Sequence, residues 1–427
     1  MELTALLVTL GVLLILGVPV AFALGASSLL TFFLLDIPLV VPFQRIAAGI
    51  NIFALMAIPF FIFAGDLMHR AGIAERLIRV ADAALGRTRG GLGQVTVGAS
   101  MLFGAVSGSA IASVSAIGSA LGPIMREKGY DGDYVVNVSS TSAITGLLIP
   151  PSHNMIIYAA AAGVSISVGD LFVAGIMPGV VTGVLLMIAA WIVAVRRGYP
   201  RGAFPGVRAF VVSLAAAIPG LLAALIIVVG ILSGVFTATE SSAIAVFYTI
   251  VVAFFVYRSL TWERFVQATT AAVRTTAMVM IIIGTAAAFG WLLAILEVPA
   301  QLASILQSIS NNPLVILLLI NLVLLVLGTF MDMAPLIIIT TPIFLPVAMG
   351  LGMDPVQFGI MLILNLGIGL VTPPVGSVLF VGSAIGRIPI ERTVRTMWPF
   401  YLSLLVALAL VTYVPTLSLW LPELLSR

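Results

Sequence analysis

The chain contains the stretch TSAITGLLIPP at residues 141–151 and a second stretch of the same plan, LNLGIGLVTPP, at residues 364–374. Each stretch is apolar, contains glycine and ends in a Pro-Pro pair, and the two pairs are 223 residues apart. Proline lacks a backbone N–H and disfavours helical geometry in the residue before it, so a pair of prolines interrupts a helix. An interrupted helix inside a membrane leaves polar backbone groups that line a cavity or hold an ion. Two such helices in one apolar chain therefore indicate a transport site.

The composition places the chain in a bilayer. Hydrophobic residue types make up 61% of its 427 residues and charged types only 8%, against about 25% charged residues in a soluble protein. A chain of this length has room for roughly ten spans of about 20 residues. Residues 1–24 are apolar, with no basic region before them and no A-x-A pattern after them. They are predicted to form a retained first helix and not a cleaved signal peptide.

Several kinds of chemistry are excluded by the residues that the sequence lacks. There are no cysteines, which excludes disulfides and thiolate metal sites, and the two histidines are too few for a histidine-rich metal centre. The only lysine, Lys128, follows a glutamate, so the chain has no P-loop for ATP hydrolysis. A serine hydrolase built on Ser152 and His153 is disfavoured because no G-x-S-x-G motif occurs.

The two halves of the chain carry their positive charges in complementary places. Residues 70–89 contain five arginines, whereas the matching stretch 293–312 contains no lysine or arginine. The reverse holds for 163–170, which has no positive residue, and 386–395, which has three arginines. Since positive residues mark cytoplasmic loops, equivalent loops of the two halves lie on opposite sides of the membrane. The chain is therefore predicted to be an inverted repeat.

These patterns predict an all-α integral membrane protein with two re-entrant helical hairpins and two broken transmembrane helices. The first hairpin enters from the cytoplasm, the second enters from outside, and both termini lie outside. Arg45 is the one positive residue expected at an outer helix end. The polar segment 258–274 is predicted to be either an interfacial amphipathic helix or a cytoplasmic loop. The expected spans are 4–24, 27–44, 48–66, the hairpin 92–125, the broken span 133–163, 171–195, 211–232, 240–257, 271–293, the hairpin 313–348, the broken span 357–385 and 396–420.

The two hairpin tips hold the first candidate ligands. The first tip reads GAVSGSAIAS at residues 104–113, and its small residues leave carbonyl and hydroxyl oxygens free to face a cation. The alternative for this tip is helix packing through small residues. The second tip contains Asp332, and an acid inside a membrane is a candidate for function. Asp332 also fits the capping position of a helix that begins just before Pro335.

The two broken spans are predicted to leave four carbonyl groups without helical partners, at Gly146, Ile149, Gly369 and Thr372. The half-helix that restarts after each Pro-Pro pair directs its positive end at the gap, which suits an anionic group. The alternative is a pair of kinked helices with no ligand. Recurrence of the pair at one offset, in opposite orientations, argues against that alternative.

Other polar residues fit structural roles. Thr237 and Glu240 have the spacing of a capping box that opens a helix. Asp66 and Arg70 have the i,i+4 spacing of an ion pair at a helix end.

With these motifs in place, the chain resembles the large membrane subunit of tripartite ATP-independent periplasmic (TRAP) transporters, within the ion-transporter superfamily. The resemblance covers essentially the whole chain. It is carried by AGDLMHRAGIAERLI (64–78), GAVSGSAIASVSAIGS (104–119), TATESSAIA (237–245), GTFMDMAP (328–335) and VTPPVG (371–376).

The resemblance implies Na⁺-coupled uptake of an organic acid across a bacterial or archaeal inner membrane by an elevator mechanism, and not an enzyme. The acid would belong to the C4-dicarboxylate, sialic or sugar acid, or keto acid class. The implied partners are a small four-helix membrane subunit and a periplasmic substrate-binding protein. The ions would be two or more Na⁺, with no organic cofactor. The alternative function is a passive channel or membrane scaffold subunit without its own ion coupling.

The resemblance also implies a division of the chain into scaffold and transport parts. Scaffold helices of the first repeat occupy 1–66, and linking and scaffold helices occupy 171–293. The two halves of the transport domain occupy 67–170 and 294–395, and a C-terminal helix occupies 396–427.

The resemblance further implies two sodium sites and a substrate site between them. Ser113 departs from the family, since related chains often carry Asp at that place. The first sodium site would use Ser107, Ser109, Gly146, Ile149 and Pro151, the second would use Gly328, Gly369, Thr372 and Val375, and the substrate would lie near Ser109, Ser152 and Asp332.

Overall fold

The computed structural model describes residues 2–202 and 205–425. These residues form helices and no β-strand, which confirms the prediction of an all-α chain. Within them, six helices are long and apolar enough to cross a membrane, or seven if the bent pair near the C-terminus counts as one span. Of the shorter apolar helices, three lie in the N-terminal segment and the others belong to the hairpins and broken spans.

The N-terminal segment differs from the predicted helix 4–24. Helix α1 (Glu2–Ile15) ends before Gly17, which has φ +79°, and α2 (Val20–Leu34) begins after Pro19 and packs back against α1. At 1.5 Å per residue each helix is about 22 Å long, short of the roughly 30 Å hydrocarbon core. The segment is therefore a helical pair and not a single span.

The next crossing is made in three pieces in place of the predicted helices 27–44 and 48–66. These pieces are α3 (Val40–Ile50), the short 3₁₀ helix η1 (Phe53–Met56) and α4 (Ala57–Arg70). Arg45 therefore lies inside α3 and not at a helix end, and its guanidinium sits 4.7 Å from the centre of the Trp291 ring. This cation–π contact gives a structural role to Arg45, the one arginine whose place did not fit the rule that positive residues lie on the cytoplasmic side.

The first hairpin and broken span lie close to their predicted places. The hairpin consists of α6 (Gly91–Ser107) and α7 (Ala110–Glu127). The broken span consists of α8 (Gly132–Ser142), the single turn α9 (Thr145–Leu148) and α10 (His153–Ala161).

The second hairpin and broken span repeat this plan. The hairpin consists of α16 (Pro313–Gly328) and α17 (Met333–Gly350). The broken span consists of α18 (Pro355–Gly369) and α19 (Ser377–Gly386), separated by seven residues that include the second Pro-Pro pair.

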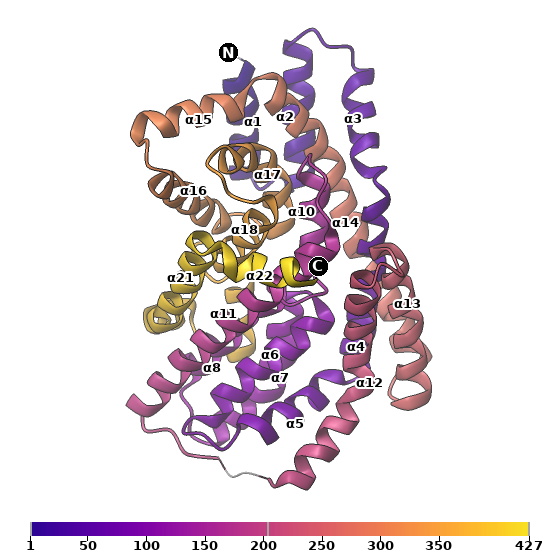
Figure 1. Ribbon diagram of the computed structural model, residues 1–427, viewed down its shortest axis with the longest axis vertical. Coiled ribbons are helices and arrows are strands. Elements are labelled where there is room, and N and C mark those ends of the chain that lie inside the picture. The colour runs from indigo at the N-terminus through magenta and orange to yellow at the C-terminus, as the bar shows by residue number, and fades with distance from the viewer. Residues whose placement is uncertain (1, 203–204, 426–427) are drawn as a thin grey trace.

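Two short helices lead toward the two hairpins from opposite ends of the molecule. Helix α5 (Ile73–Leu85), within the arginine-rich stretch, lies at the lower end in Figure 1, and α15 (Val298–Ile309) lies at the upper end. They occupy corresponding places in the two halves of the sequence. Their positions at opposite ends agree with the inverted orientation that the charges predict.

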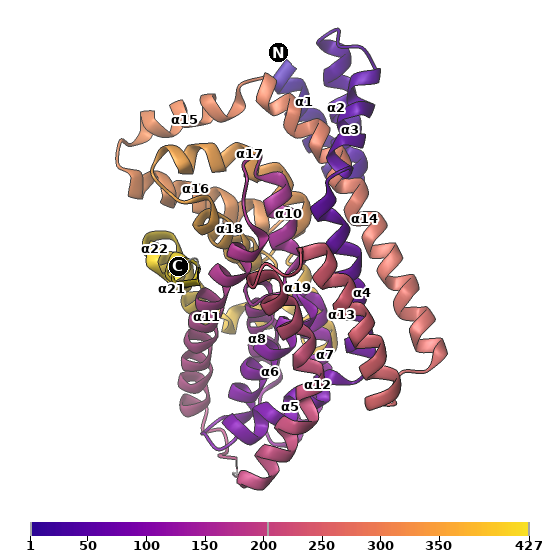
Figure 2. The same ribbon diagram turned by 45° about the vertical axis from the view of Figure 1, so that its right-hand side comes forward.

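Long helices connect and support these halves. They are α11 (Val168–Arg196), α12 (Val207–Leu232), α13 (Ala238–Val251) with the π-helix η2 (Val252–Val256), and α14 (Trp262–Ile295). Helix α14 is about 51 Å long and runs along one side of the molecule (Figure 2). The loop alternative for the segment 258–274 is therefore wrong, and the helix alternative holds only in that residues 262–274 are helical, because they are the start of the unbroken helix α14 and not a separate helix. Thr261 caps it by accepting the N–H of Arg264 at 3.3 Å.

The C-terminal segment also departs from the predicted helix 396–420. Helix α20 (Ile390–Thr396) meets α21 (Trp398–Tyr413) at a bend of 61°, and α22 (Pro415–Leu425) follows. Pro415 lacks the N–H that would continue α21, so the chain starts a new helix, which packs on α11.

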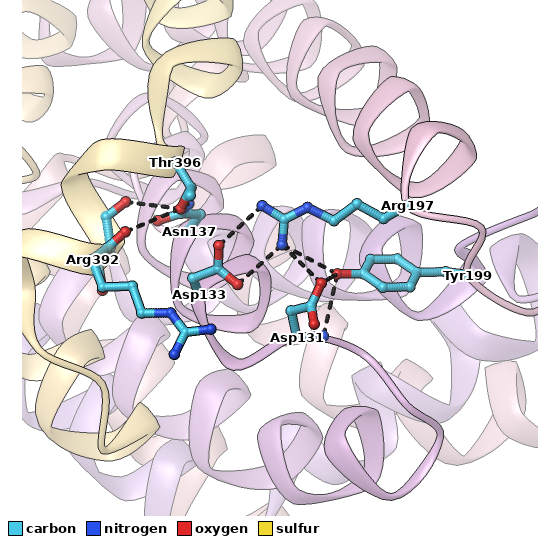
Figure 3. Close-up of polar contacts among 8 residues, drawn as sticks. Asp131, Asp133, Asn137, Arg197, Tyr199, Arg392 and Thr396 are labelled. Carbon is cyan, nitrogen blue, oxygen red and sulfur yellow. Dashed lines mark hydrogen bonds and ion pairs between the residues drawn. The ribbon is translucent and has the colours of Figure 1, made fainter.

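Polar contacts tie the start of α8 to its neighbours (Figure 3). Arg197, at the end of α11, donates two hydrogen bonds to the Asp133 carboxylate, at 3.0 and 2.9 Å, and one to Asp131 at 3.0 Å. On the other side of α8, the Asn137 amide donates to the Thr396 hydroxyl of α20 at 2.8 Å. The first broken span is thus fixed at this end from two sides.

Candidate functional site

Each hairpin packs on its own broken span through a pair of glycines. A Cβ atom on Gly146 would lie 2.6 Å from the Cα of Gly104, and a Cβ on Gly369 would lie 2.6 Å from the Cα of Gly328. Real Cβ atoms do not approach another atom this closely. The backbones of hairpin and broken span are therefore in direct contact in both halves, and this contact brings each tip to its break.

The tips themselves reach the residues around the Pro-Pro pairs. At the first tip, Gly108 has φ +60°, and a Cβ there would lie 2.8 Å from the carbonyl oxygen of Pro151. At the second tip, the carbonyl oxygen of Thr329 accepts the N–H of Val375 at 3.0 Å. Each predicted sodium site thus draws on a tip and a break that lie side by side.

The breaks leave some backbone carbonyl groups without hydrogen-bond partners. The sequence predicted four such groups, and the structure does not leave all four of them unpartnered. The residue four positions after Gly146 and after Gly369 is a proline, which cannot donate to either carbonyl. The prediction is nevertheless wrong for Gly369, because the chain makes one more tight turn and Thr372 N–H donates to the Gly369 oxygen at 3.0 Å. Among the described residues, no hydrogen bond reaches the carbonyl oxygen of Ile149 or of Thr372. Both residues directly precede a Pro-Pro pair, and both pairs are joined by a cis peptide bond.

A cavity of about 250 Å³ lies between the two hairpin tips. The N-terminal ends of three helices form part of its wall: Ala110 of α7, His153 of α10 and Met333 of α17 all line it. The positive ends of three helix dipoles therefore meet at one place, which favours a negatively charged group. The polar side chains of the wall are Asp66, Ser107, Ser109, His153, Asn154, Thr275 and Asp332.

Ser109 and Asp332 combine a capping role with a place at the cavity. The Ser109 hydroxyl accepts the N–H of Ala112 at 3.3 Å, and the Asp332 carboxylate accepts the N–H of Met333 at 3.0 Å. Both side chains keep further lone pairs. Asp332 therefore caps α17, as the sequence allowed, and also lines the cavity.

Two predicted residues lie behind the cavity wall. Ser152 is fully buried, its hydroxyl has no hydrogen-bond partner among the described residues, and its neighbour His153 takes the place at the wall. The side chain of Ile149 points toward Gly179 of α11, so only its backbone faces the first tip. Ser113 is likewise fully buried in α7, and its hydroxyl is unpaired within the described chain.

Sequence reasoning missed Asp66 as a cavity residue. Its expected partner Arg70 instead donates to the Gln267 side chain at 2.9 Å, and no ion pair of Asp66 forms among the described residues. The signal was present, since Asp66 is an acid within an apolar helix. Thr275 was also missed, and it carries no such signal because it is one hydroxyl in the long helix α14.

The described residues contain no group of three or more His, Asp or Glu side chains placed to hold a metal ion. Any cation at this site would therefore be bound largely by backbone carbonyl and hydroxyl oxygens. Inside a membrane, such oxygens are available where helices are broken.

Broken helices, re-entrant hairpins and a central cavity are features of a membrane transporter. The fold is similar to that of the YdaH transporter of Alcanivorax borkumensis, with a TM-score of 0.61, 16% sequence identity, and coverage of 89% of this chain and 88% of that one. Residues 7–417 match the family described as tripartite ATP-independent periplasmic transporter, DctM component. The chain belongs to this family.

Curated relatives extend this result over nearly the full length. The chain is 40% identical to the sialic acid TRAP transporter large permease protein of Vibrio cholerae, over 96% of each chain. It is 42% identical to the C4-dicarboxylate TRAP transporter large permease protein of Pseudomonas aeruginosa, over 87% of this chain and 86% of that one. These relatives are named as permeases and not as enzymes. Together with the apolar helices, the family identifies a multi-pass protein of the bacterial inner membrane.

Proposed function

We propose that this chain is the membrane permease of a Na⁺-coupled importer of an organic acid and that it works by an elevator mechanism. The observation that carries the proposal is the convergence of three helix N-termini on the cavity that also holds Ser109 and Asp332. Relatives named for sialic acid and for C4-dicarboxylate indicate the class of substrate.

The cavity chemistry fits a carboxylate that carries further polar groups. The carboxylate would lie against the N–H groups at the starts of α7 and α10, where helix dipoles stabilise negative charge, because the Asp332 carboxylate already caps α17. Asp332 and Asp66 would repel a carboxylate and instead accept hydrogen bonds from hydroxyl or amide groups. The two acids would therefore orient the substrate with its carboxylate toward the helix ends.

Na⁺ would bind on both sides of this cavity. We assign the first site to oxygens of Ser107, Ser109, Gly146, Ile149 and Pro151, and the second to oxygens of Gly328, Gly369, Thr372 and Val375. Support comes from the free carbonyls of Ile149 and Thr372, which hold equivalent positions in the two halves. Unwound backbone carbonyls of this kind coordinate Na⁺ in secondary transporters.

Coupling would follow from charge. Loading Na⁺ beside each tip places positive charge near a cavity that contains two carboxylates and receives an anion. Each ion thus offsets the repulsion between the substrate and those carboxylates, so that substrate and Na⁺ bind together.

The chain would work with a small four-helix membrane subunit and a periplasmic substrate-binding protein, and the tripartite, periplasmic character that the family description names supports two such partners. A surface for the small subunit is available on the N-terminal helices, where large apolar side chains are exposed. Examples of these exposed side chains are Leu16, Phe33 and Phe43, whose exposed fractions are 72%, 69% and 61%.

The hairpins and broken spans would move as one transport domain against the remaining helices.

Uptake by proteoliposomes that contain the chain, its small subunit and its binding protein tests the proposal. Radiolabelled sialic acid and a C4-dicarboxylate are suitable first substrates. We expect accumulation that requires an inward Na⁺ gradient and stops when the gradient is collapsed. Uptake that is indifferent to Na⁺ would refute the coupling. Single-channel currents would instead identify a passive pore.

A further inference from the structure

A second hollow, of about 560 Å³, opens at the arginine-rich end of the molecule, about one helical turn along α4 from Asp66 of the central cavity. It forms where α4 ends, α5 begins and α14 begins, at the lower end of these helices in Figure 2. Positive residues mark the cytoplasmic side, so the hollow lies at the cytoplasmic surface of the membrane. The transport mechanism gives it no role.

The hollow is strongly basic and its arginines lack acidic partners. Four arginines line it, and the only acid in its wall is Glu75. Within the described chain none of the four forms an ion pair. Three of them bond only to neutral oxygens: Arg70 to Gln267, Arg76 to the carbonyl of Gly72, and Arg264 to the carbonyl of Ser259. A guanidinium has five N–H donors, so most donors in the hollow remain free.

Two of these arginines are held in place for a ligand. Arg70 is anchored by its hydrogen bond to Gln267, and its buried Nε leaves the terminal nitrogens as the groups that a ligand can reach. Arg76 lies flat on the Tyr257 ring, with its guanidinium carbon 3.7 Å from the ring centre. Such stacking orients a guanidinium without using up its donors.

Two exposed aromatic side chains lie close in the chain to residues of the hollow, Trp262 two residues before Arg264 and Phe255 two residues before Tyr257, on which Arg76 stacks. Trp262, at the start of α14, is 71% exposed, and Phe255 of η2 is 72% exposed. Aromatic residues of this kind sit at the level of lipid headgroups. A free anion would gain nothing from these residues, whereas acyl chains would pack against them.

We infer that this hollow binds the headgroup of an anionic phospholipid from the cytoplasmic leaflet. The phosphate lies among the four arginines and accepts hydrogen bonds from their terminal N–H groups, and the acyl chains follow the faces that bear Trp262 and Phe255. Basic pockets on the cytoplasmic side of membrane helices bind such headgroups. The bound lipid bridges the elbow between α4 and α5, where Gly72 has φ +70°, to the start of α14.

Native mass spectrometry of the full chain, titrated with phosphatidylglycerol, tests this inference without any transport measurement. The double variant Arg79→Gln/Arg264→Gln should bind the first phosphatidylglycerol about 30-fold more weakly, since each surface guanidinium contributes a factor of about five toward anionic lipid. Phosphatidylcholine should bind equally to variant and wild type. Arg208→Gln is the matched control, because Arg208 lies at the same end in the first turn of α12 but outside the hollow.

Weaker lipid binding could also result from misfolding, so a variant that is expected to bind lipid more tightly is a useful second test. Glu75→Gln removes the only acid of the hollow and should tighten phosphatidylglycerol binding about fivefold. Binding of phosphatidylglycerol should also persist in an equal concentration of inorganic phosphate. Equal affinities for wild type, the double variant and Glu75→Gln would overturn the inference. Complete displacement by inorganic phosphate would overturn it too and would identify a site for a free anion.

Discussion

Ser109 and Asp332 occupy equivalent positions in the two halves of the chain, 223 residues apart, and both line the same cavity. Each is the N-cap of the second arm of its hairpin. The repeat therefore builds one site from two copies of the same local structure. The two copies differ in chemistry, since one offers a hydroxyl and the other a carboxylate. If the proposed substrate binds here, this difference would allow a symmetric scaffold to hold an asymmetric molecule in one orientation.

Replacing Asp332 with asparagine separates its two roles. Asparagine caps a helix as well as aspartate does, so thermal stability should stay within about 0.5 kcal/mol of wild type. Transport should fall roughly 10- to 100-fold, because a charged hydrogen bond contributes about 1.5–3 kcal/mol. Uptake in proteoliposomes at matched protein content measures the effect.

The control for this substitution is Glu240→Gln. Glu240 closes the capping box of α13, in which its side chain accepts the N–H of Thr237 at 2.8 Å. Glutamine also serves in a capping box, and the residue is exposed and far from the cavity, so uptake should be unchanged. Equal losses in the two variants would remove Asp332 from the substrate site.

Alanine at Gly146 or Gly369 should destabilise the contact between hairpin and broken span. The new methyl group would meet backbone atoms of Gly104 or Gly328, which cannot move aside as a side chain can. A loss of about 1–3 kcal/mol is expected for each, with a lower melting temperature in detergent. Gly350→Ala is the matched control, because nothing lies within 4 Å of its Cβ position. A melting temperature as high as that of the control would show that the two backbones are not in contact.

The sequence was sufficient to place the two halves and their breaks. The second hairpin was predicted at 313–348 and lies at 313–350, because Pro313 opens α16 and the GTFMD tip separates it from α17. Proline and glycine act locally, so their effects can be read from the chain alone. The N-terminal error has a different cause. Gly17 and Pro19 lie within a continuous apolar stretch, which was predicted as one helix. Hydropathy does not distinguish one long helix from two short ones.

The composition of the cavity could be predicted only in part. Ser109 and Asp332 stood out because they belong to repeated motifs. Thr275 reaches the cavity only because α14 passes beside both tips, a tertiary relationship that no local pattern encodes. Asp66 was assigned a helical ion pair by its spacing, but Arg70 takes a partner 197 residues away. Local spacing therefore predicted the wrong partner for Arg70, because the distant helix α14 supplies Gln267 as its hydrogen-bond acceptor.

Asp66→Asn tests whether the missed acid belongs to the transport site. The substitution preserves shape and hydrogen bonding but removes a charge from the cavity wall. We expect uptake to fall at least tenfold at physiological Na⁺ and the Na⁺ concentration for half-maximal uptake to change. Asp170→Asn is the control, since Asp170 is exposed in the first turn of α11, away from the cavity. If both variants transport like wild type, Asp66 is only part of the wall.

A polar cluster around Arg197 and Asp133 holds the start of α8 in place (Figure 3). The Asp133 side chain is only 5% exposed, so removing Arg197 leaves a buried carboxylate without its two hydrogen bonds. Arg197→Gln should therefore lower the free energy of unfolding by about 1–3 kcal/mol. Its neighbour Arg196→Gln, which changes an exposed side chain, should leave stability unchanged.

A double-mutant cycle with Asp133→Asn distinguishes this pair from a general effect of charge. If Arg197 acts through Asp133, the double variant should be less destabilised than the sum of the single variants by about 1 kcal/mol or more, because each substitution removes the same contact. Melting temperatures and denaturant midpoints in one detergent give the four values. Strict additivity would show that Arg197 stabilises the chain through Asp131 or Tyr199 instead, with which it also forms hydrogen bonds at 3.0 and 3.4 Å.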